Sequence, residues 1–258
     1  MNPVAIFAAT RWEIHALQRA LPVGRVVKNK VIRCSAGHRN SRFYWLAQTG
    51  VGPQAARRVA ERLLADQTVS MVVSAGFACA LVPAQIGDVL LADEILSVNM
   101  ENSQGRQEAV SVSCDLTVNA LLAEAAGRAR IPVHLGKVLS SSAVVWRAND
   151  KRNLSRVTGA VGLDMESAAL GTVAADHGVP FVVVRTVSDL VDEELPLDFN
   201  LFLRPSGWAK GMWSLVTQPS SISGLNRLRR QSRVAGDRLT QVFAAWVAGG
   251  YERTQQES

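Results

Sequence analysis

The chain has 258 residues, of which 48% are hydrophobic and 19% charged, a balance typical of a folded globular protein rather than a disordered one. This length suffices for one large α/β domain with a substantial core. The net charge of +6 does not indicate a nucleic-acid-binding protein, because no basic stretch is interleaved with aromatic residues. The three cysteines contain no CxxC pair, so neither a disulfide framework nor a zinc site is predicted, and we expect reduced thiols.

Two features of hydropathy bear on location. No apolar stretch reaches the roughly 18 residues that a membrane-spanning helix needs. The first residues, MNPVAIFAATRWE, contain a short apolar run followed by charges, which does not resemble a signal peptide. We therefore expect a cytoplasmic protein.

The first half of the chain alternates predicted strands and helices. Apolar runs predict buried strands, residues 26–49 favour antiparallel strands or a hairpin, and Gly50-Val-Gly-Pro begins a helix because proline is well tolerated at a first helical position. The predicted elements are a strand at Val4–Ala9, the hairpin at 26–49, a helix at Gln54–Asp66, a strand at Val69–Ala75 and a strand at Ile86–Ile95.

The second half continues the alternation up to about residue 205. The predicted elements are a helix at Leu116–Ala129, strands at Val133–Leu139 and Ala160–Leu163, a helix at Met165–His177 that Gly178 ends, and a strand at Pro180–Val187. This order predicts a three-layer α/β/α sandwich around a central mixed sheet. After two linker-like stretches, a long helix with one apolar face is predicted over about Leu225–Val247. We therefore expect a catalytic domain at residues 1–205 and a helical C-terminal extension at residues 206–258.

Three groups of acidic residues lie where predicted strands end, which is where open α/β sheets place their sites. Glu13 follows the first strand, Asp164-Met165-Glu166 joins a strand to a helix, and Ser188-Asp189 follows the strand PFVVVRTV. Asp164 has an alternative role as a helix cap, and Glu166 is also favoured near a helix N-terminus by the helix dipole.

Together these segments resemble the nucleoside phosphorylase superfamily, in particular the methylthioadenosine/S-adenosylhomocysteine nucleosidases and the hopanoid-associated phosphorylases. The resemblance covers about residues 3–203. It is carried by VAIFAATRWEIHAL, by VVSAGFACALVPAQIGDVLLADEI, and above all by VGLDMESAALGTVAADHGVPFVVVRTVSD.

The resemblance implies a role for each candidate residue in cleaving the N-glycosidic bond of a purine nucleoside. Asp189 matches the acid that protonates N7 of the leaving purine, which needs a raised pKa, and Ser188 supports it. Glu13 matches the carboxylate that activates the attacking water. The remaining residues are expected to bind substrate: Glu166 the ribose hydroxyls, Met165 the underside of the ribose, and the backbone near Val145 the base edge.

The chain departs from this family pattern around the expected phosphate loop, Ser74–Ala80. Phe77, a further candidate substrate-binding residue, stands where a serine or threonine is expected, and the loop contains no arginine. Ser140–Ser142 or Arg11 are alternative phosphate donors. The expected base-stacking aromatic is replaced by Val144, with Trp146 as a substitute. These departures favour water over phosphate, although phosphate remains an alternative co-substrate; no metal or organic cofactor is implied.

The tail favours one substrate among several. Leu195-Pro196, an apolar segment around Trp208 and an arginine-rich helix resemble the hopanoid-associated members, so adenosylhopane is the preferred substrate. The alternatives are a soluble methylthioadenosine, S-adenosylhomocysteine or futalosine nucleosidase, and a non-catalytic nucleoside-binding protein.

Location and assembly follow from the same resemblance. Trp208, Met212 and Trp213, with Arg227, Arg229, Arg230 and Arg233, suit peripheral contact with the inner membrane face; the alternative is an ordinary helix with solvated arginines. We also expect a homo-oligomer, and no nucleic-acid partner.

Overall fold

The computed structural model describes residues 2–21, 23–29, 32–39, 42–98, 111–195 and 220–249. In this part of the chain the strands are β1 Val4–Ala8, β2 Val23–Asn29, β3 Ile32–Arg39, β4 Arg42–Gln48, β5 Met71–Ala80, β6 Val89–Val98, β7 Ser111–Ser113, β8 Val133–Ser141, β9 Gly162–Asp164 and β10 Phe181–Asp189. The helices are α1 Arg11–Ala20, α2 Pro53–Asp66, α3 Leu116–Arg128, α4 Ala148–Thr158, α5 Ser167–Asp176 and α8 Ser220–Ala248.

The strands form one mixed sheet in the order β10-β6-β8-β9-β5-β1-β4-β3-β2, with β7 beside β6. β10 also pairs with β5, so that β10, β6, β8, β9 and β5 close into a ring. The central pairs β1–β5 and β10–β5 are parallel, which places the carboxyl ends of these three strands at one edge.

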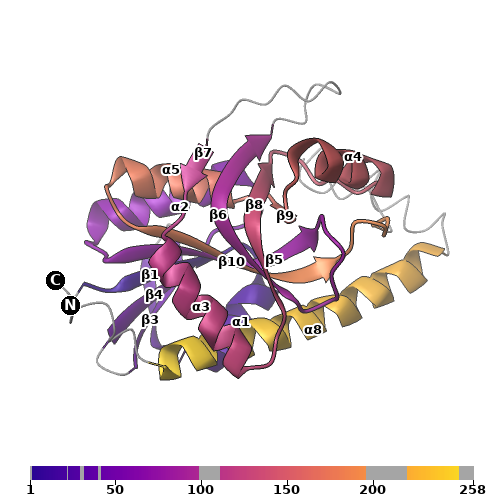
Figure 1. The fold of residues 1–258 in the computed structure, drawn as a ribbon. Helices are drawn as coiled ribbons and strands as arrows, with labels where there is room; N and C mark the ends of the chain where they lie inside the picture. Colours follow the sequence, from indigo (N-terminus) through magenta and orange to yellow (C-terminus); the bar gives the residue numbers. More distant parts are fainter. Residues whose placement is uncertain are drawn as a thin grey trace.

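Helices cover both faces of the sheet (Figure 1). One apolar core joins the sheet to α1, α3 and α8, and a second joins it to α2 and α5. Every residue of β1 and β10 is buried, as expected for strands covered on both faces. The predicted three-layer α/β/α sandwich with a C-terminal helix is confirmed.

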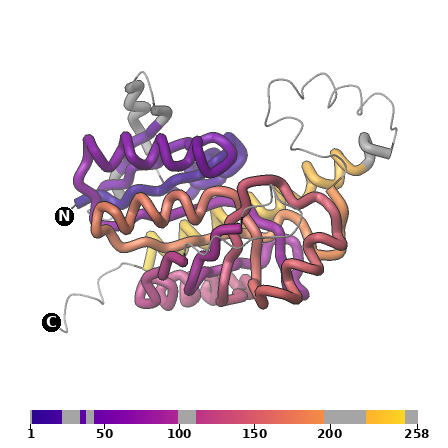
Figure 2. Tube along the Cα trace, turned by 90° about the horizontal axis from the view of Figure 1, so that it is seen from above, coloured from indigo at the N-terminus to yellow at the C-terminus, as the bar shows by residue number. Residues whose placement is uncertain are grey.

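The long C-terminal helix was also predicted. α8 runs along the described domain (Figure 2) and packs on α1, α3 and β10 through Leu239, Val242 and Trp246 of its predicted apolar face. Among the described residues, no helix has the length and apolar character needed to cross a bilayer. Trp208, Met212, Trp213 and the predicted boundary at residue 205 lie outside the described residues.

One strand boundary was predicted wrongly and one helix was missed. The strand expected to end at Ala75 continues to Ala80, because β5 keeps its parallel pairing with β10 from Val72 to Cys79. The segment Ser74–Ala80 is therefore strand and not loop. Helix α4 was not predicted, since its sequence, ANDKRNLSRVT, contains few apolar residues.

Candidate functional site

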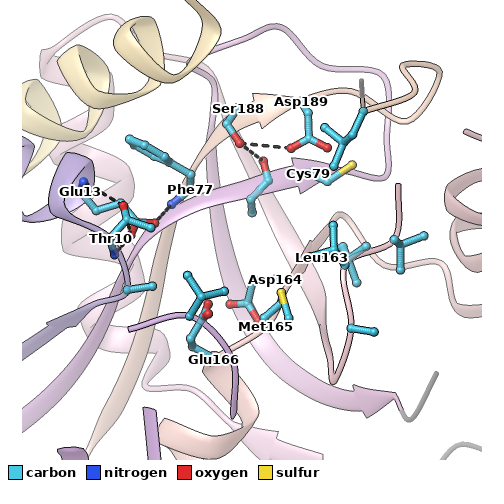
Figure 3. Close-up of a pocket in the computed structure, with 17 residues that line it drawn as sticks. Thr10, Glu13, Phe77, Cys79, Leu163, Asp164, Met165, Glu166, Ser188 and Asp189 are labelled. Atoms are coloured by element: carbon cyan, nitrogen blue, oxygen red, sulfur yellow. Dashed lines mark hydrogen bonds between the residues drawn. The ribbon is translucent and has the colours of Figure 1, made fainter. Parts of the chain in front are cut away.

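A cavity of about 210 Å³ lies at the carboxyl ends of β1, β5 and β10, beside the start of α5. All seven residues that the sequence predicted for the site line this cavity: Glu13, Phe77, Val145, Met165, Glu166, Ser188 and Asp189. Figure 3 shows the carboxylates of Glu13, Glu166 and Asp189 on three different sides of it. The fold thus brings together acidic groups that are far apart in the sequence.

Glu13 is fixed by the first turn of α1. Thr10 caps this helix in a capping box, in which the Thr10 side chain accepts from Glu13 N and Glu13 Oε2 accepts from Thr10 N at 2.7 Å and from Thr10 Oγ1 at 2.8 Å. Glu13 Oε1 accepts from Phe77 N at 2.7 Å. The side chain is buried and both of its oxygens are held, so the carboxylate is oriented before any ligand binds.

Gly76 makes room for this carboxylate. A Cβ atom at position 76 would lie 2.2 Å from Glu13 Oε1 and 2.5 Å from Arg185 Nη1. The glycine at the centre of β5 therefore lets Glu13 and Arg185 approach the strand closely.

Arg185 is a buried cation close to the carboxylates of Asp164, Glu166 and Glu13, and its place in the site was not predicted. It is 1% exposed, forms an ion pair with Asp164 at 2.7 Å, and donates to Ser74 Oγ at 2.8 Å and Ser167 Oγ at 3.0 Å. Burial lowers the pKa of Arg185, but the carboxylates of Asp164, Glu166 and Glu13 raise it more, so the guanidinium remains charged. Its signal in the sequence was a lone charge inside the apolar run PFVVVRTV.

Asp164 belongs to this network rather than to the cavity's reactive groups. It also accepts from Ser167 N, at 3.3 Å, and from Ser167 Oγ at the start of α5. Asp164 thus accepts a free N–H group at the start of α5, the contact expected of its alternative role, although Glu166 is the residue directly before the helix.

Glu166 lies at the N-terminus of α5, where its Oε1 accepts from Gly52 N at 2.8 Å. Gly52 has a φ of 96°, a left-handed conformation that glycine adopts without strain. Burial, which has the largest effect, and the nearby Asp164 carboxylate together raise the pKa of Glu166 to about 7, against the opposing effects of Arg185 and of the Gly52 N–H group. Hydroxyl donors from a sugar would stabilise the ionised form of this group.

Asp189 is held by a different kind of partner. Lys151 Nζ, from α4, donates to Asp189 Oδ2 at 2.8 Å, and Ser188 Oγ donates to Asp189 Oδ1 at 3.1 Å. The lysine side chain is fully buried. The predicted support of Asp189 by Ser188 is present, whereas Lys151 was missed because it lies in a segment rich in charged residues that resembles an exposed helix.

The side of the cavity near Val145 lacks the aromatic residue that was expected as a substitute. Ala143, Val144, Val145 and Met165 line it, and Val145 is buried. The Trp146 ring is instead stacked on Arg147, whose Cζ lies 4.7 Å from the ring centroid, and is not among the lining residues. Trp146 as the base-stacking residue is therefore wrong.

Several of the donors considered for phosphate already have partners, and one lies elsewhere. Glu13 accepts from Phe77 N, and the Ser74 hydroxyl is bonded to Arg185 and Ser167. Ser141 Oγ donates to Ala143 O at 2.7 Å. Arg11 lines a second, separate groove of about 600 Å³ between α1 and α8. That groove is larger, but none of Glu13, Glu166 and Asp189 lines it. The smaller cavity is therefore the candidate active site.

Comparison with known proteins finds relatives of similar fold. A 5′-methylthioadenosine/S-adenosylhomocysteine nucleosidase of Staphylococcus aureus is 22% identical over 209 residues, covering 78% of this chain and 92% of that protein. A solved nucleosidase of the same name from Neisseria meningitidis has a TM-score of 0.75 at 18% identity, over 97% of this chain and 100% of its own. The futalosine hydrolase of Helicobacter pylori has a TM-score of 0.70 at 20% identity, over 93% of this chain and 97% of its own.

A family model covers most of the chain. Residues 3–205 match the Phosphorylase superfamily, which is the superfamily that the sequence motifs indicated. The predictions of this superfamily and of an enzyme are therefore confirmed. The chain belongs to the phosphorylase superfamily.

Proposed function

We propose that this protein hydrolyses the N-glycosidic bond of a 5′-substituted purine nucleoside and releases the free base. The observation that carries the proposal is the arrangement of Glu13, Glu166 and Asp189 around one cavity. Departure of a purine requires a nucleophile at the sugar, groups that hold the sugar, and a proton for the base. Three separate carboxylates can supply these three functions.

Glu13 is proposed to orient and deprotonate the attacking water. Its two oxygens are held by Phe77 N and Thr10, so a water molecule bonded to it would have a fixed position. Water is favoured over phosphate because the hydroxyl and N–H donors of Ser74 and Phe77 already have partners. Phosphate as a co-substrate is the alternative. Base release measured with and without added phosphate tests it.

Glu166 and Asp189 are proposed to act on the sugar and the base. Ionised Glu166 would accept hydrogen bonds from the ribose hydroxyls, with Met165 beneath the ring. Asp189 would protonate N7 of the purine while the bond between C1′ and N9 breaks, supported by Ser188. Phe77 and Val145 complete the walls of the cavity. The chemistry uses carboxylates and water and requires no metal or organic cofactor.

The relatives favour a soluble 5′-substituted nucleoside as substrate. Both the S. aureus relative and the N. meningitidis structure are nucleosidases for methylthioadenosine and S-adenosylhomocysteine, and the H. pylori structure is a futalosine hydrolase. A direct test measures base release from methylthioadenosine, S-adenosylhomocysteine and futalosine. Release from at least one of them, at a rate that Asp189→Asn lowers sharply, supports the proposal, and release from none of them contradicts it for soluble substrates.

A lipid-linked nucleoside, adenosylhopane, is the second candidate. The observation that favours it is a row of exposed arginines on α8, Arg227, Arg229, Arg230 and Arg233, near a groove that also carries the half-exposed Trp12. Basic and aromatic side chains of this kind suit contact with an anionic membrane surface. Adenine release from adenosylhopane in detergent, without release from methylthioadenosine, would select this candidate.

Location and assembly complete the proposal. We propose a cytoplasmic homo-oligomer whose partner is its small-molecule substrate. Light scattering would test the oligomeric state. Sedimentation with anionic vesicles would test the contact of α8 with the inner membrane face.

A further inference from the structure

A buried lysine outside the predicted site contacts the proposed proton donor. Lys151 lies in α4, and its Nζ donates to Asp189 Oδ2 at 2.8 Å, to Glu193 O at 2.9 Å and to Leu190 O at 3.3 Å. These three acceptors match the three protons of an ammonium group. The side chain has no exposed surface, so water does not replace these partners.

Burial of this charge is unfavourable unless a negative partner offsets it. Burial is the largest single effect and lowers the pKa of Lys151, but the combined effects of Asp189, which is the larger, and Cys79 raise it, and the net shift is upward. The neighbouring Cys79 thiol stays neutral because burial, followed by the Asp189 charge, raises its pKa well above the usual value. Asp189 is therefore the anion that Lys151 faces.

The same lysine also fixes the segment that follows β10. Its bonds to Leu190 O and Glu193 O hold residues 190–193 against α4, and Leu195 N donates to Trp146 O at 3.0 Å just before α4. Leu195 lines the cavity. One side chain thus links the acid to the chain segment that closes the base side.

We infer that Lys151 is a positioning residue that promotes departure of the purine by stabilising the Asp189 carboxylate left after proton transfer. In this step the C1′–N9 bond breaks and its electron pair stays with the base. The proton moves from Asp189 Oδ1 to N7, and Lys151 keeps all three of its protons. The ion pair in the structure corresponds to the state after donation, and Asp189 takes up a proton from solvent before the next turnover, which balances the proton that the attacking water loses. The inference rests on the proposed function.

The contact between Lys151 and Asp189 is expected to matter for the rate because negative charge develops on Asp189 during the reaction. The negative charge on Asp189 grows as the proton leaves, so an ammonium bonded to Oδ2 is more favourable in the transition state than in the complex that precedes it. A leaving group that needs no proton should gain nothing from Lys151. The comparison of two leaving groups therefore separates this role from a general contribution to folding.

The test compares Lys151→Gln with the parent enzyme on methylthioadenosine and on the 4-nitrophenyl glycoside of 5-methylthioribose, whose nitrophenolate leaves unprotonated. We expect a roughly ten- to hundredfold loss of kcat on methylthioadenosine, with KM changed much less, and little loss on the nitrophenyl glycoside. Lys137→Gln serves as the matched control, since Lys137 is half-exposed on β8 and pairs with Glu94. Equal losses on both substrates, or no loss on either, would overturn the inference.

A double-mutant cycle provides a second test. If Lys151 acts through Asp189, then Lys151→Gln should lower kcat little further in the Asp189→Asn background, whereas independent losses would add. Additive losses would overturn the inference even if Lys151→Gln is less stable. Absence of base release by the parent enzyme would instead contradict the proposed function, so the two failures are distinguishable.

Discussion

The two sides of the cavity, which we propose bind the sugar and the base, hold their carboxylates by different means. On the sugar side, Glu13 and Glu166 accept from the backbone N–H groups of Phe77 and Gly52. On the base side, Asp189 accepts from the side chains of Lys151 and Ser188. Glu13 also accepts from the Thr10 hydroxyl, but both carboxylates of the first side have a main-chain donor, while the two donors to Asp189 are side chains. The proposed acid is therefore the group that substitutions outside the cavity can affect most directly.

The two sides also differ in what their buried cation contacts. Arg185 lies within the central strand β10 and bonds to Asp164, Ser74 and Ser167, none of which is a proposed reacting group. Lys151 lies in a helix and bonds directly to the proposed proton donor. Arg185 thus holds residues that surround the proposed sugar-binding side, whereas Lys151 contacts a proposed reacting group directly.

The largest expected effect comes from Asp189→Asn, which removes the proposed proton donor. Because protonation of the base is needed mostly in the transition state, kcat should fall by about 10²- to 10⁴-fold with a small change in KM. Steady-state base release from methylthioadenosine measures both constants. Turnover within about threefold of the parent enzyme would refute the assigned role, given the 10²-fold minimum expected of a general acid.

Glu13→Gln should have the next largest effect. An amide keeps the size of the side chain but is a poor base, so kcat should fall by about 10²-fold or more. Binding of a non-hydrolysed nucleoside analogue, measured by calorimetry, should change little. Normal turnover in this variant would remove water activation by Glu13 from the mechanism.

Glu166→Gln tests the sugar side through pH. Since burial raises the pKa of Glu166 to about 7, the ionised form that accepts the ribose hydroxyls should dominate only above that pH. We expect kcat/KM of the parent enzyme to rise through pH 7 and to level off above it. The variant should lose this rise of kcat/KM with pH. Its KM should be about tenfold higher, which corresponds to the loss of one charge-assisted hydrogen bond. A rising limb that persists unchanged in the variant would assign it to another group.

The same pKa predicts a stability difference of known sign. A carboxyl whose pKa is raised from 4.5 to about 7 binds its proton more tightly in the folded state. The free energy of unfolding should therefore fall as the pH rises from about 4.5 to about 7, by on the order of 3 kcal/mol if Glu166 acts alone. Denaturant unfolding at pH 5 and pH 8 should show this fall in the parent protein and a smaller one in Glu166→Gln.

The smallest effect is expected on the outer face of α8. Arg229→Glu with Arg230→Glu reverses two exposed charges that do not line the cavity, so turnover of methylthioadenosine should stay within about twofold and stability within about 0.5 kcal/mol. Loss of binding to anionic vesicles in this variant would support the membrane-contact proposal. Unchanged vesicle binding would count against that role of α8.

Sequence patterns predicted the fold well where the pattern was long. Buried apolar runs located β1 and β10, and helical spacing located α8 within a few residues at each end. Helix α4 was missed because its exposed face dominates its composition. The extent of β5 was missed because its last residues, after Gly76, are ordered by pairing with β10, a contact distant in sequence.

The candidate site shows the same division. Glu13, Glu166 and Asp189 could be predicted because motifs mark them at the ends of predicted strands. Arg185 and Lys151 could not, since their importance comes from burial against carboxylates that the fold brings near them. Trp146 was wrongly expected in the cavity because proximity in sequence to Val145 does not fix the direction of a side chain.

The central claim is hydrolysis by water at a site of three carboxylates. Its most direct test is base release from methylthioadenosine in phosphate-free buffer made with ¹⁸O-labelled water, repeated with added phosphate. If water is the nucleophile, the rates of base release will be equal in both buffers and the free sugar will carry ¹⁸O at C1. Base release that requires phosphate and yields a sugar 1-phosphate would contradict it.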